Sequence, residues 1–333
     1  MIDGVVDVSD GLAGRLAMAG FIDLPTILGP LVRGSGDPTI RVGPGAAIRA
    51  SVTAAGPATI ELRVAGDEVR ARAWGPGARL LLDGLPALLG RDDDDGGFEP
   101  ALHPTVAALA RRRGRVLLGR TGAVWEALLP AIVEQRITGT EAWRNYRRLV
   151  RTHGTRAPGP LDLLLAPTPH DVLAIPPWRL IALGIEPRRA AVLRRAAREA
   201  SRFEGLGAAA RQPGGGGQGA ANLAAALRTI PGIGPWTAAE VTLRALGDPD
   251  AVSVGDAHLS NVVAFALTGR ARGTDEEMLD LLAPWTGHRA RVVRLLEGAG
   301  VRPPRFGPRV APRDLARDLT PREPPRGYRQ RRA

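Results

Sequence analysis

The feature that most constrains the fold is a change of hydrophobic period at an acidic, Gly-rich break. From about residue 38 to residue 83, apolar and polar residues alternate at period two, as in the segment ATIELRV at 58–64. This alternation indicates antiparallel strands with one solvent-facing side. After the run DDDDGG at 92–97, the pattern becomes helical. The sequence therefore predicts an α+β fold, in which an N-terminal antiparallel β-sheet domain with a short helix precedes a mostly α-helical domain.

The same break suggests how the chain is divided. We expect an N-terminal α+β domain at 1–91, an acidic and Gly-rich linker at 92–97, and a helical domain at 98–300. An Arg- and Pro-rich tail follows at 301–333. Four like charges beside two glycines favour a solvated linker over a metal site, whose ligands must be spaced so that they converge.

Helical periods and helix-end signals recur through the second half of the chain. A proline is tolerated at the first helical position, as at Pro187 and Pro235, and Gly247 is a typical stop signal. Helices are expected at about 24–32, 123–132, 141–150, 161–165, 187–200, 222–229, 235–246, 257–267 and 288–297.

Composition excludes several kinds of chemistry. All 45 basic residues are Arg, so Schiff-base catalysis by a lysine and a Walker-type phosphate loop are both excluded. The absence of Cys excludes disulfides, iron–sulfur clusters and thiolate zinc sites. No stretch is long and apolar enough to span a bilayer, and no signal peptide is visible. We expect a soluble, cytoplasmic protein with no membrane partner.

The tail concentrates the positive charge. Residues 301–333 hold ten Arg against three acidic residues, which gives +7 of the net +11, together with seven Pro. Such a segment cannot bury enough apolar surface to fold and is expected to be a disordered, extended arm. A polyanion partner and a merely solubilising role both remain open for it.

The most informative motif is LRTIPGIGPWTAAE at 227–240. A helix ends near Thr229, the Pro-Gly-Ile-Gly segment turns the chain, and a second helix starts at Pro235. Gly232 and Gly234 allow the backbone to approach another molecule, and the free N–H groups that start the second helix suit a phosphate. Such a device binds DNA without reading its sequence. Taken alone, the segment is more often an ordinary turn between helices than a phosphate-binding device.

About twenty residues further on, AVSVGDAHLSN at 251–261 opens another helix. A hairpin followed by this Asp resembles the helix-hairpin-helix (HhH-GPD) DNA glycosylase superfamily, and the hairpin looks like that of bacterial DNA-3-methyladenine glycosylase II, the AlkA type. Three further segments are similar to that type, so the resemblance covers roughly residues 20–298. These segments are GDPTIR at 36–41, LPAIVEQRIT at 129–138 and LAPWTGHR at 282–289.

The resemblance implies a DNA repair enzyme. It would flip a nucleotide out of damaged double-stranded DNA, hydrolyse the N-glycosidic bond of an alkylated purine (3-methyladenine or 7-methylguanine), and begin base excision repair. A nucleoid-associated monomer without a required cofactor is implied, with a structural K⁺ or Na⁺ held at the hairpin by the backbone carbonyls of Arg228, Ile230 and Ile233. Two alternatives stay open: a glycosylase for a deaminated or oxidised purine, and a non-catalytic DNA-binding protein.

The resemblance also assigns two central roles. Asp256 would be the catalytic carboxylate, although an Asp before a helix is also a good N-cap, and both roles can hold together. Trp236 stands where bifunctional relatives such as endonuclease III keep a nucleophilic Lys. The activity implied is therefore monofunctional, without lyase chemistry at a side-chain amine. Trp236 would be an aromatic wall for the extruded base, or else a core residue.

Other residues receive less specific roles. Glu240, four residues after Trp236, would either favour cationic bases from within the pocket or be an exposed helix residue. Gln135 and Arg136 would lie where a flipped nucleotide leaves a gap, with Arg136 stacking between bases or contacting phosphate. Gln135 and Trp285 are further candidates for the base pocket, and Trp285 is otherwise a core residue. Gly232, Ile233, Gly234 and Thr237 would contact the DNA backbone.

Overall fold

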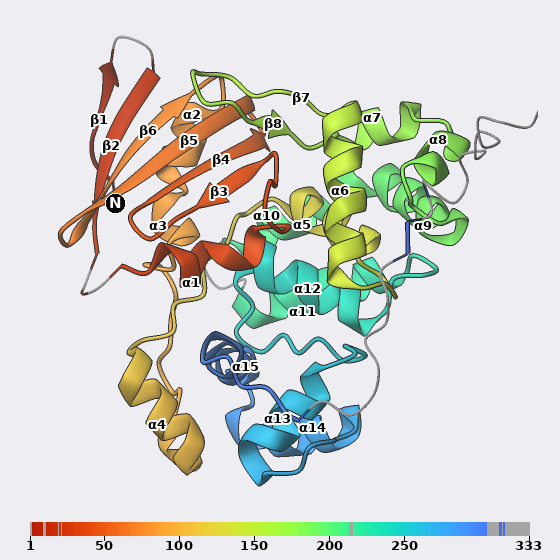
Figure 1. Cartoon of the computed structure of the whole chain (residues 1–333). Helices are drawn as coiled ribbons and strands as arrows, with labels where there is room; N and C mark the ends of the chain where they lie inside the picture. The colour runs from red at the N-terminus through yellow and green to blue at the C-terminus, as the bar shows by residue number, and fades with distance from the viewer. Residues whose placement is uncertain are drawn as a thin grey trace, which may run out of the picture.

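The computed structural model describes residues 2–8, 11–18, 20, 22–212, 216–304, 313–314 and 316. It confirms the predicted fold class, because a six-stranded antiparallel sheet precedes a mostly helical region (Figure 1). Most of the tail predicted to be a disordered arm lies outside the described residues. None of the helices within those ranges is long and apolar enough to cross a membrane.

The N-terminal sheet has the strand order β1-β2-β6-β5-β4-β3. Its strands are β1 (Asp3–Val8), β2 (Gly11–Ala17), β3 (Ile40–Val42), β4 (Ala46–Thr53), β5 (Gly56–Ala65) and β6 (Glu68–Trp74). The alternation seen in the sequence turns Leu16, Ile60 and Val69 toward one buried face. Three helices pack there: α1 (Leu24–Leu28), α2 (Ala78–Asp83) and α3 (Leu85–Leu88).

One predicted helix, at 161–165, is wrong. The segment instead contributes β8 (Leu164–Leu165), which pairs with β7 (Thr155–Arg156). Leu163 and Leu165 pack against Ala50 on the other face of the sheet. Burial against the sheet thus overrides the local propensity of a short leucine-rich segment.

A central helical lobe surrounds one hydrophobic core. Its helices are α5 (Val124–Val133), α6 (Gly139–His153), α7 (Pro169–Ala174), α8 (Pro177–Ala182), α9 (Pro187–Arg198), α10 (Ala200–Ala210), α11 (Gly216–Arg228) and α12 (Pro235–Leu246). Helix α5 is buried on nearly every side because α6, α9, α10 and α12 all pack against it (Figure 1). This rigid arrangement holds the hairpin between α11 and α12.

A C-terminal helical lobe has its own core. It contains α13 (Leu259–Thr268), α14 (Asp275–Leu282) and α15 (Arg289–Gly298), together with α4 (Pro104–Arg113) from an earlier part of the chain. Helix α4 packs against α15. The chain therefore contributes α4 to the C-terminal lobe, forms the central lobe next, and completes the C-terminal lobe with α13, α14 and α15.

The acidic run at 92–97 was predicted to be a solvated linker, but part of it is engaged in ion pairs with the C-terminal lobe. The carboxylate of Asp93 accepts two hydrogen bonds from Arg291, at 2.5 and 2.7 Å, and Arg291 is fully buried. Asp95 pairs with Arg115 at 2.7 Å. A buried guanidinium needs a charged partner. Asp93 therefore attaches the acidic run to the C-terminal lobe through Arg291. The domain boundaries placed around it remain predictions.

Candidate active site

The hairpin between α11 and α12 is held from inside. Ile230 and Ile233 are buried in the central core, and the Ile233 amide donates to the Ile230 carbonyl at 2.9 Å. Gly232 has a φ of +102°, and a Cβ there would lie 2.4 Å from Cγ2 of Val192 on α9. Only glycine fits that position. At Gly234 a Cβ would meet no atom within 4 Å. Both glycines were predicted to let another molecule approach, and the space beside the Cα is open at Gly234 but filled by Val192 at Gly232.

Two residues expected to contact DNA are engaged within the protein. The amide of Ile233 is used in the turn, and the Thr237 side chain is buried, with its hydroxyl accepting a hydrogen bond from Gln135. The DNA contacts predicted for Ile233 and Thr237 remain predictions, which other atoms of these residues would have to make. Gly234 caps α12 without a side-chain oxygen, so the positive end of this helix is not neutralised by its own cap.

Asp256 and Trp236 meet across the two helical lobes. The indole Nε1–H of Trp236 donates to Oδ2 of Asp256 at 3.3 Å, and both residues are half-buried. Oδ1 of Asp256 accepts the amides of His258 and Leu259 at 2.8 and 3.0 Å, at the start of α13. The N-cap of α13 is His258, so Asp256 holds the start of the helix from two residues before the N-cap and not as the predicted N-cap itself. The neutral N–H donors and the helix dipole stabilise its negative charge.

The side chain of Gln135 binds the hairpin through two hydrogen bonds. Its Nε2 donates to the Gly232 carbonyl at 3.0 Å and to the Thr237 hydroxyl at 2.9 Å. Sequence analysis placed Gln135 in the base pocket, but in the structure its amide joins the end of α5 to α12. The next residue, Arg136, is exposed with a φ of +56°, the one non-glycine residue at positive φ in the described ranges. This left-handed turn projects Arg136 away from the helix core.

Glu240 lies one turn beyond Trp236 on α12. Its side chain is only 14% exposed, so the alternative of an exposed helix residue is wrong. Oε2 lies 2.6 Å from Nη1 of Arg244, and Oε1 accepts the Ser253 hydroxyl at 2.6 Å. Burial by itself raises the pKa of Glu240, but Arg244 and the Ser253 hydrogen bond outweigh it and hold the pKa below the usual range. The carboxylate is thus an ionised member of a buried pair.

This pair belongs to a cluster of buried charges that sequence analysis missed. Arg33, before the third strand, pairs with Glu134 at the end of α5 at 2.7 Å. Burial raises the pKa of Glu134, against the opposing effect of Arg33 and Arg244. Burial also lowers the pKa of Arg294 on α15. The cluster joins the N-terminal domain to both helical lobes directly behind the hairpin. The i,i+4 spacing of Glu240 and Arg244 was the one signal available in the sequence.

Trp285 does not line an open pocket. It is 4% exposed in the core of the C-terminal lobe, and its indole donates to the carbonyl of Glu99 at 2.9 Å. The prediction of a base-pocket role is therefore corrected in favour of the core alternative, because its hydrophobic ring packs among the helices of that lobe.

The predicted cation at the hairpin receives a limited test. The Ile230 carbonyl already accepts the Ile233 amide, although a carbonyl oxygen keeps a second lone pair that could face an ion. Among the described residues, no group of three or more His, Asp or Glu side chains could hold a metal ion. Backbone carbonyls of Arg228, Ile230 and Ile233 therefore remain the proposed ligands.

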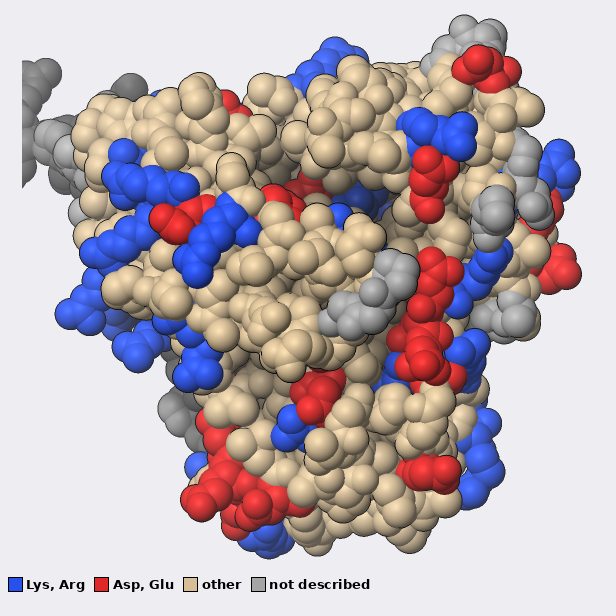
Figure 2. Space-filling model, turned by 180° about the vertical axis from the view of Figure 1, so that it is seen from behind, with Lys and Arg blue, Asp and Glu red and all other residues tan. Residues whose placement is uncertain are grey.

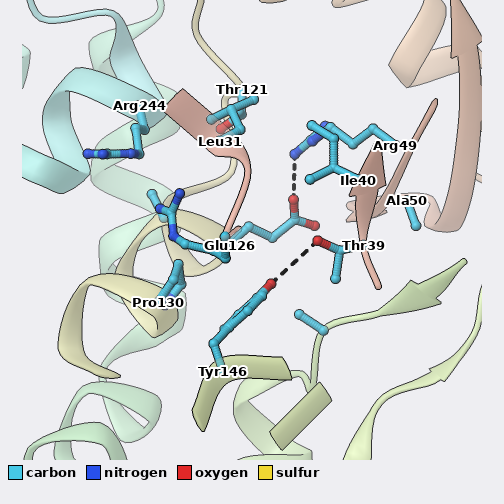
Figure 3. A pocket seen from close by; sticks show the side chains of 13 residues that line it. Leu31, Thr39, Ile40, Arg49, Ala50, Thr121, Glu126, Pro130, Tyr146 and Arg244 are labelled. Atoms are coloured by element: carbon cyan, nitrogen blue, oxygen red, sulfur yellow. Dashed lines mark hydrogen bonds and ion pairs between the residues drawn. The ribbon is translucent and has the colours of Figure 1, made fainter. Parts of the chain in front are cut away.

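A small cavity lies where the sheet meets the central lobe (Figure 3). Glu126 bridges this junction by accepting hydrogen bonds from Arg49 at 2.5 Å and from Ser51 at 2.7 Å. Burial raises the pKa of Tyr146, whose hydroxyl lies 3.5 Å from that of Thr39. The space open to the centres of water molecules is about 40 Å³, and neither Trp236 nor Asp256 lines the cavity. The cavity is part of the domain junction rather than a base pocket.

Charged side chains gather on parts of both lobes. On the face drawn in Figure 2, arginines gather on the side of the central lobe where α8 and α9 lie, and both acidic side chains and arginines lie over the C-terminal lobe. Helix α9 adjoins the hairpin, because Arg195 donates to the Pro231 carbonyl at 3.4 Å. A polyanion is therefore attracted to the hairpin side of the central lobe.

Solved structures with the same arrangement are DNA glycosylases. A 3-methyladenine DNA glycosylase from Archaeoglobus fulgidus superposes with a TM-score of 0.71 at 18% identity, covering 85% of this chain and 97% of its own. This chain has the fold of DNA glycosylases. MBOgg1, in complex with a low-affinity DNA ligand, gives a TM-score of 0.67 at 15% identity and covers 89% of this chain and 99% of its own.

An 8-oxoguanine glycosylase/lyase from Clostridium acetobutylicum shares the glycosylase fold as well. Bound to double-stranded DNA with cytosine opposite 8-oxoguanine, it gives a TM-score of 0.65 at 13% identity and covers 89% of this chain and 96% of its own. No protein-family model matches the sequence, and no curated protein matches it significantly. The glycosylase fold is thus common to relatives that act on alkylated and on oxidised purines, and the AlkA type is not singled out.

Proposed function

We propose that this protein is a monofunctional DNA glycosylase that starts base excision repair on damaged double-stranded DNA. The observation that carries the proposal is the contact of 3.3 Å between Trp236 Nε1 and Asp256 Oδ2, beside a helix-hairpin-helix turn. It places a carboxylate held by neutral donors next to an aromatic side chain that can stack on an extruded base. The chain would act as a monomer, with Arg136 and Gly234 on the side that meets DNA.

The chemistry requires only a carboxylate and water. As the bond between the sugar C1′ and the base nitrogen breaks, the base leaves with the electron pair and positive charge develops on the sugar. Asp256 stabilises that charge electrostatically. Water then bonds to C1′ and loses a proton, which leaves an abasic site. Because the chain has no Lys, and Trp236 stands beside Asp256, no side-chain amine is available for strand cleavage through a Schiff base.

The finer proposal is excision of alkylated purines such as 3-methyladenine and 7-methylguanine. Methylation at N3 or N7 makes the base cationic and a good leaving group, so modest help at the sugar suffices. The ion pair of Glu240 with Arg244 favours a second candidate, a neutral oxidised or deaminated purine, because this carboxylate is already neutralised. Substrate preference therefore depends on fit and on the ease of flipping.

The test is release of bases from defined duplexes. The wild type should release 3-methyladenine and 7-methylguanine from methylated DNA. The abasic strand that remains should break only after treatment with alkali. Asp256→Asn should slow release about 10³-fold, while Asp280→Asn, which changes an exposed residue of α14, is the matched control. Equal background release by wild type and Asp256→Asn would refute an enzymatic function. Duplexes with hypoxanthine or 8-oxoguanine distinguish the second candidate.

A further inference from the structure

The described part of the C-terminal segment is attached to α6. The carboxylate of Asp314 accepts two hydrogen bonds from Arg148, at 2.6 and 2.9 Å, and lies 3.7 Å from Arg144. The amide of Arg313 donates to Glu141 at 3.3 Å, and Arg144 donates to the Arg313 carbonyl. Both backbone and side chain therefore take part in the contact.

This contact is specific rather than a bulk charge attraction. Residues 301–333 carry ten Arg and only three acidic residues, so the segment as a whole is repelled by an arginine pair. One of those few carboxylates nevertheless sits on Arg148. The planar guanidinium binds it through two parallel hydrogen bonds, the geometry with which Arg also binds a phosphate group.

The arginine pair can be reached by another ligand. The side chains of Arg144 and Arg148 are 25% and 34% exposed, and their spacing of four residues places them on one face of α6. Asp314 is 23% exposed, so water competes with the contact. An ion pair in this setting contributes little and is readily exchanged for another anion.

The helix that carries the pair starts near residues that contact the hairpin. Helix α6 begins three residues after Arg136 and four after Gln135, which donates to the Gly232 carbonyl. Helix α9 contacts both the end of α5, where Arg189 donates to the Val133 carbonyl at 2.8 Å, and the hairpin, where Val192 lies against Gly232. A duplex on the hairpin therefore runs within reach of α6, since a helix is only about 10 Å across.

We propose that Arg144 and Arg148 form a binding site for a DNA backbone phosphate, and that Asp314 occupies this site in the free protein. The inference rests on the proposed function, because the competing anion is the DNA on which the enzyme acts. Contact with Asp314 weakens binding to undamaged DNA by competition and is released when a duplex engages the hairpin. A partly exposed pair of this kind corresponds to about a fivefold change in affinity.

The test measures affinity for an undamaged duplex at low salt by fluorescence anisotropy, using the full chain. Asp314→Asn should bind about fivefold more tightly than wild type. Asp318→Asn, which changes the charge of the same segment by the same amount, is the matched control and should bind like wild type. Arg148→Gln should weaken binding about fivefold in the Asp314→Asn background. It should change little in the wild-type background, where it removes the competing contact as well.

Four outcomes would overturn the inference. Equal tightening by Asp314→Asn and Asp318→Asn would mean that bulk charge alone acts. An Arg148→Gln effect of the same size in both backgrounds would mean that Asp314 and phosphate do not share the site. Absence of duplex binding by every variant would overturn the proposed function together with the inference, whereas lesion release without any Asp314 effect would overturn the inference alone.

Discussion

Two carboxylates flank Trp236, and their surroundings differ sharply. Asp256 is half-buried and held by the Trp236 indole and two backbone amides, all of them neutral donors. Glu240, one turn along α12 from Trp236, is held by the guanidinium of Arg244 and by the hydroxyl of Ser253. Their places in the sequence suggested that both belong to one pocket.

The difference shows that the groups bonded to a carboxylate, and not its nearness to Trp236, decide what the carboxylate can do. A carboxylate held by neutral dipoles keeps a field that can stabilise positive charge developing on a bound molecule. A carboxylate beside a buried guanidinium has its field cancelled at short range and instead holds the fold together. The proposed function accordingly gives Asp256 the chemical role, whereas Glu240 belongs to a buried ion pair.

The largest expected effect is on activity at Asp256. Asp256→Asn should slow excision about 10³-fold, or about 4 kcal/mol, because the amide carries no charge to stabilise the sugar. Its melting temperature should change little, since Asn caps a helix nearly as well as Asp. Single-turnover rates of abasic-site formation and thermal unfolding measure the two effects. A loss equally large in well-folded Glu240→Gln would erase the distinction between the carboxylates.

The next largest effect is on stability at Glu240. Glu240→Gln should lower the free energy of unfolding by about 3 kcal/mol, because Arg244 is left buried without its charged partner. Asp83→Asn is the matched control, since Asp83 is 47% exposed and pairs with the exposed Arg79 at a spacing of four residues, as Glu240 does with Arg244. Its cost should stay below about 1 kcal/mol. Urea unfolding compares the variants, and equal costs would show that burial of the Glu240 pair does not matter.

A smaller effect should appear in the pH dependence of stability. The pKa of Glu240 is lowered in the folded state from its ordinary value of 4.5. Its contribution is therefore present above about pH 4.5 and is lost as the pH falls through the lower folded pKa. The stability difference between wild type and Glu240→Gln should shrink from pH 6 toward about pH 3. A difference that stays constant across this range would contradict the lowered pKa.

The smallest effect is expected at the indole. Trp236→Phe keeps a ring for stacking and removes one hydrogen bond to Asp256, so excision should slow only a fewfold, by about 1 kcal/mol. Trp236→Ala is the comparison variant and should lose more through weaker binding of the extruded base. Single-turnover excision at several enzyme concentrations separates binding from chemistry. Identical rates for Phe and Ala variants would remove the stacking role of Trp236.

Much of the fold could be predicted because it follows from periodicity. The alternation at 58–64 is strand β5, and the helices expected at 141–150 and 235–246 are α6 and α12. Strand β2 was missed because small and glycine residues hide its alternation. The helix expected at 161–165 was wrong because the sheet decides the conformation of this segment.

The site could be predicted only in its local parts. That the Asp256 carboxylate accepts amides at the start of α13 follows from its position three residues before the first residue of that helix. The attachment of Gln135 to the hairpin spans 102 residues to Thr237. The burial of Trp285 depends on Glu99, 186 residues away. No local pattern contains such contacts.

The sequence by itself determined the elements and the chemical repertoire. It places the hairpin, and it places Asp256 just before a helix. Because the chain has no Lys, the proposed reaction relies on water and a carboxylate. Only the tertiary structure decided which charges are paired, because Arg33, Glu134 and Arg244 come from segments that meet only when the lobes pack. Desolvation and pairing depend on those neighbours, so the roles of Asp256 and Glu240 were set by packing rather than by residue type.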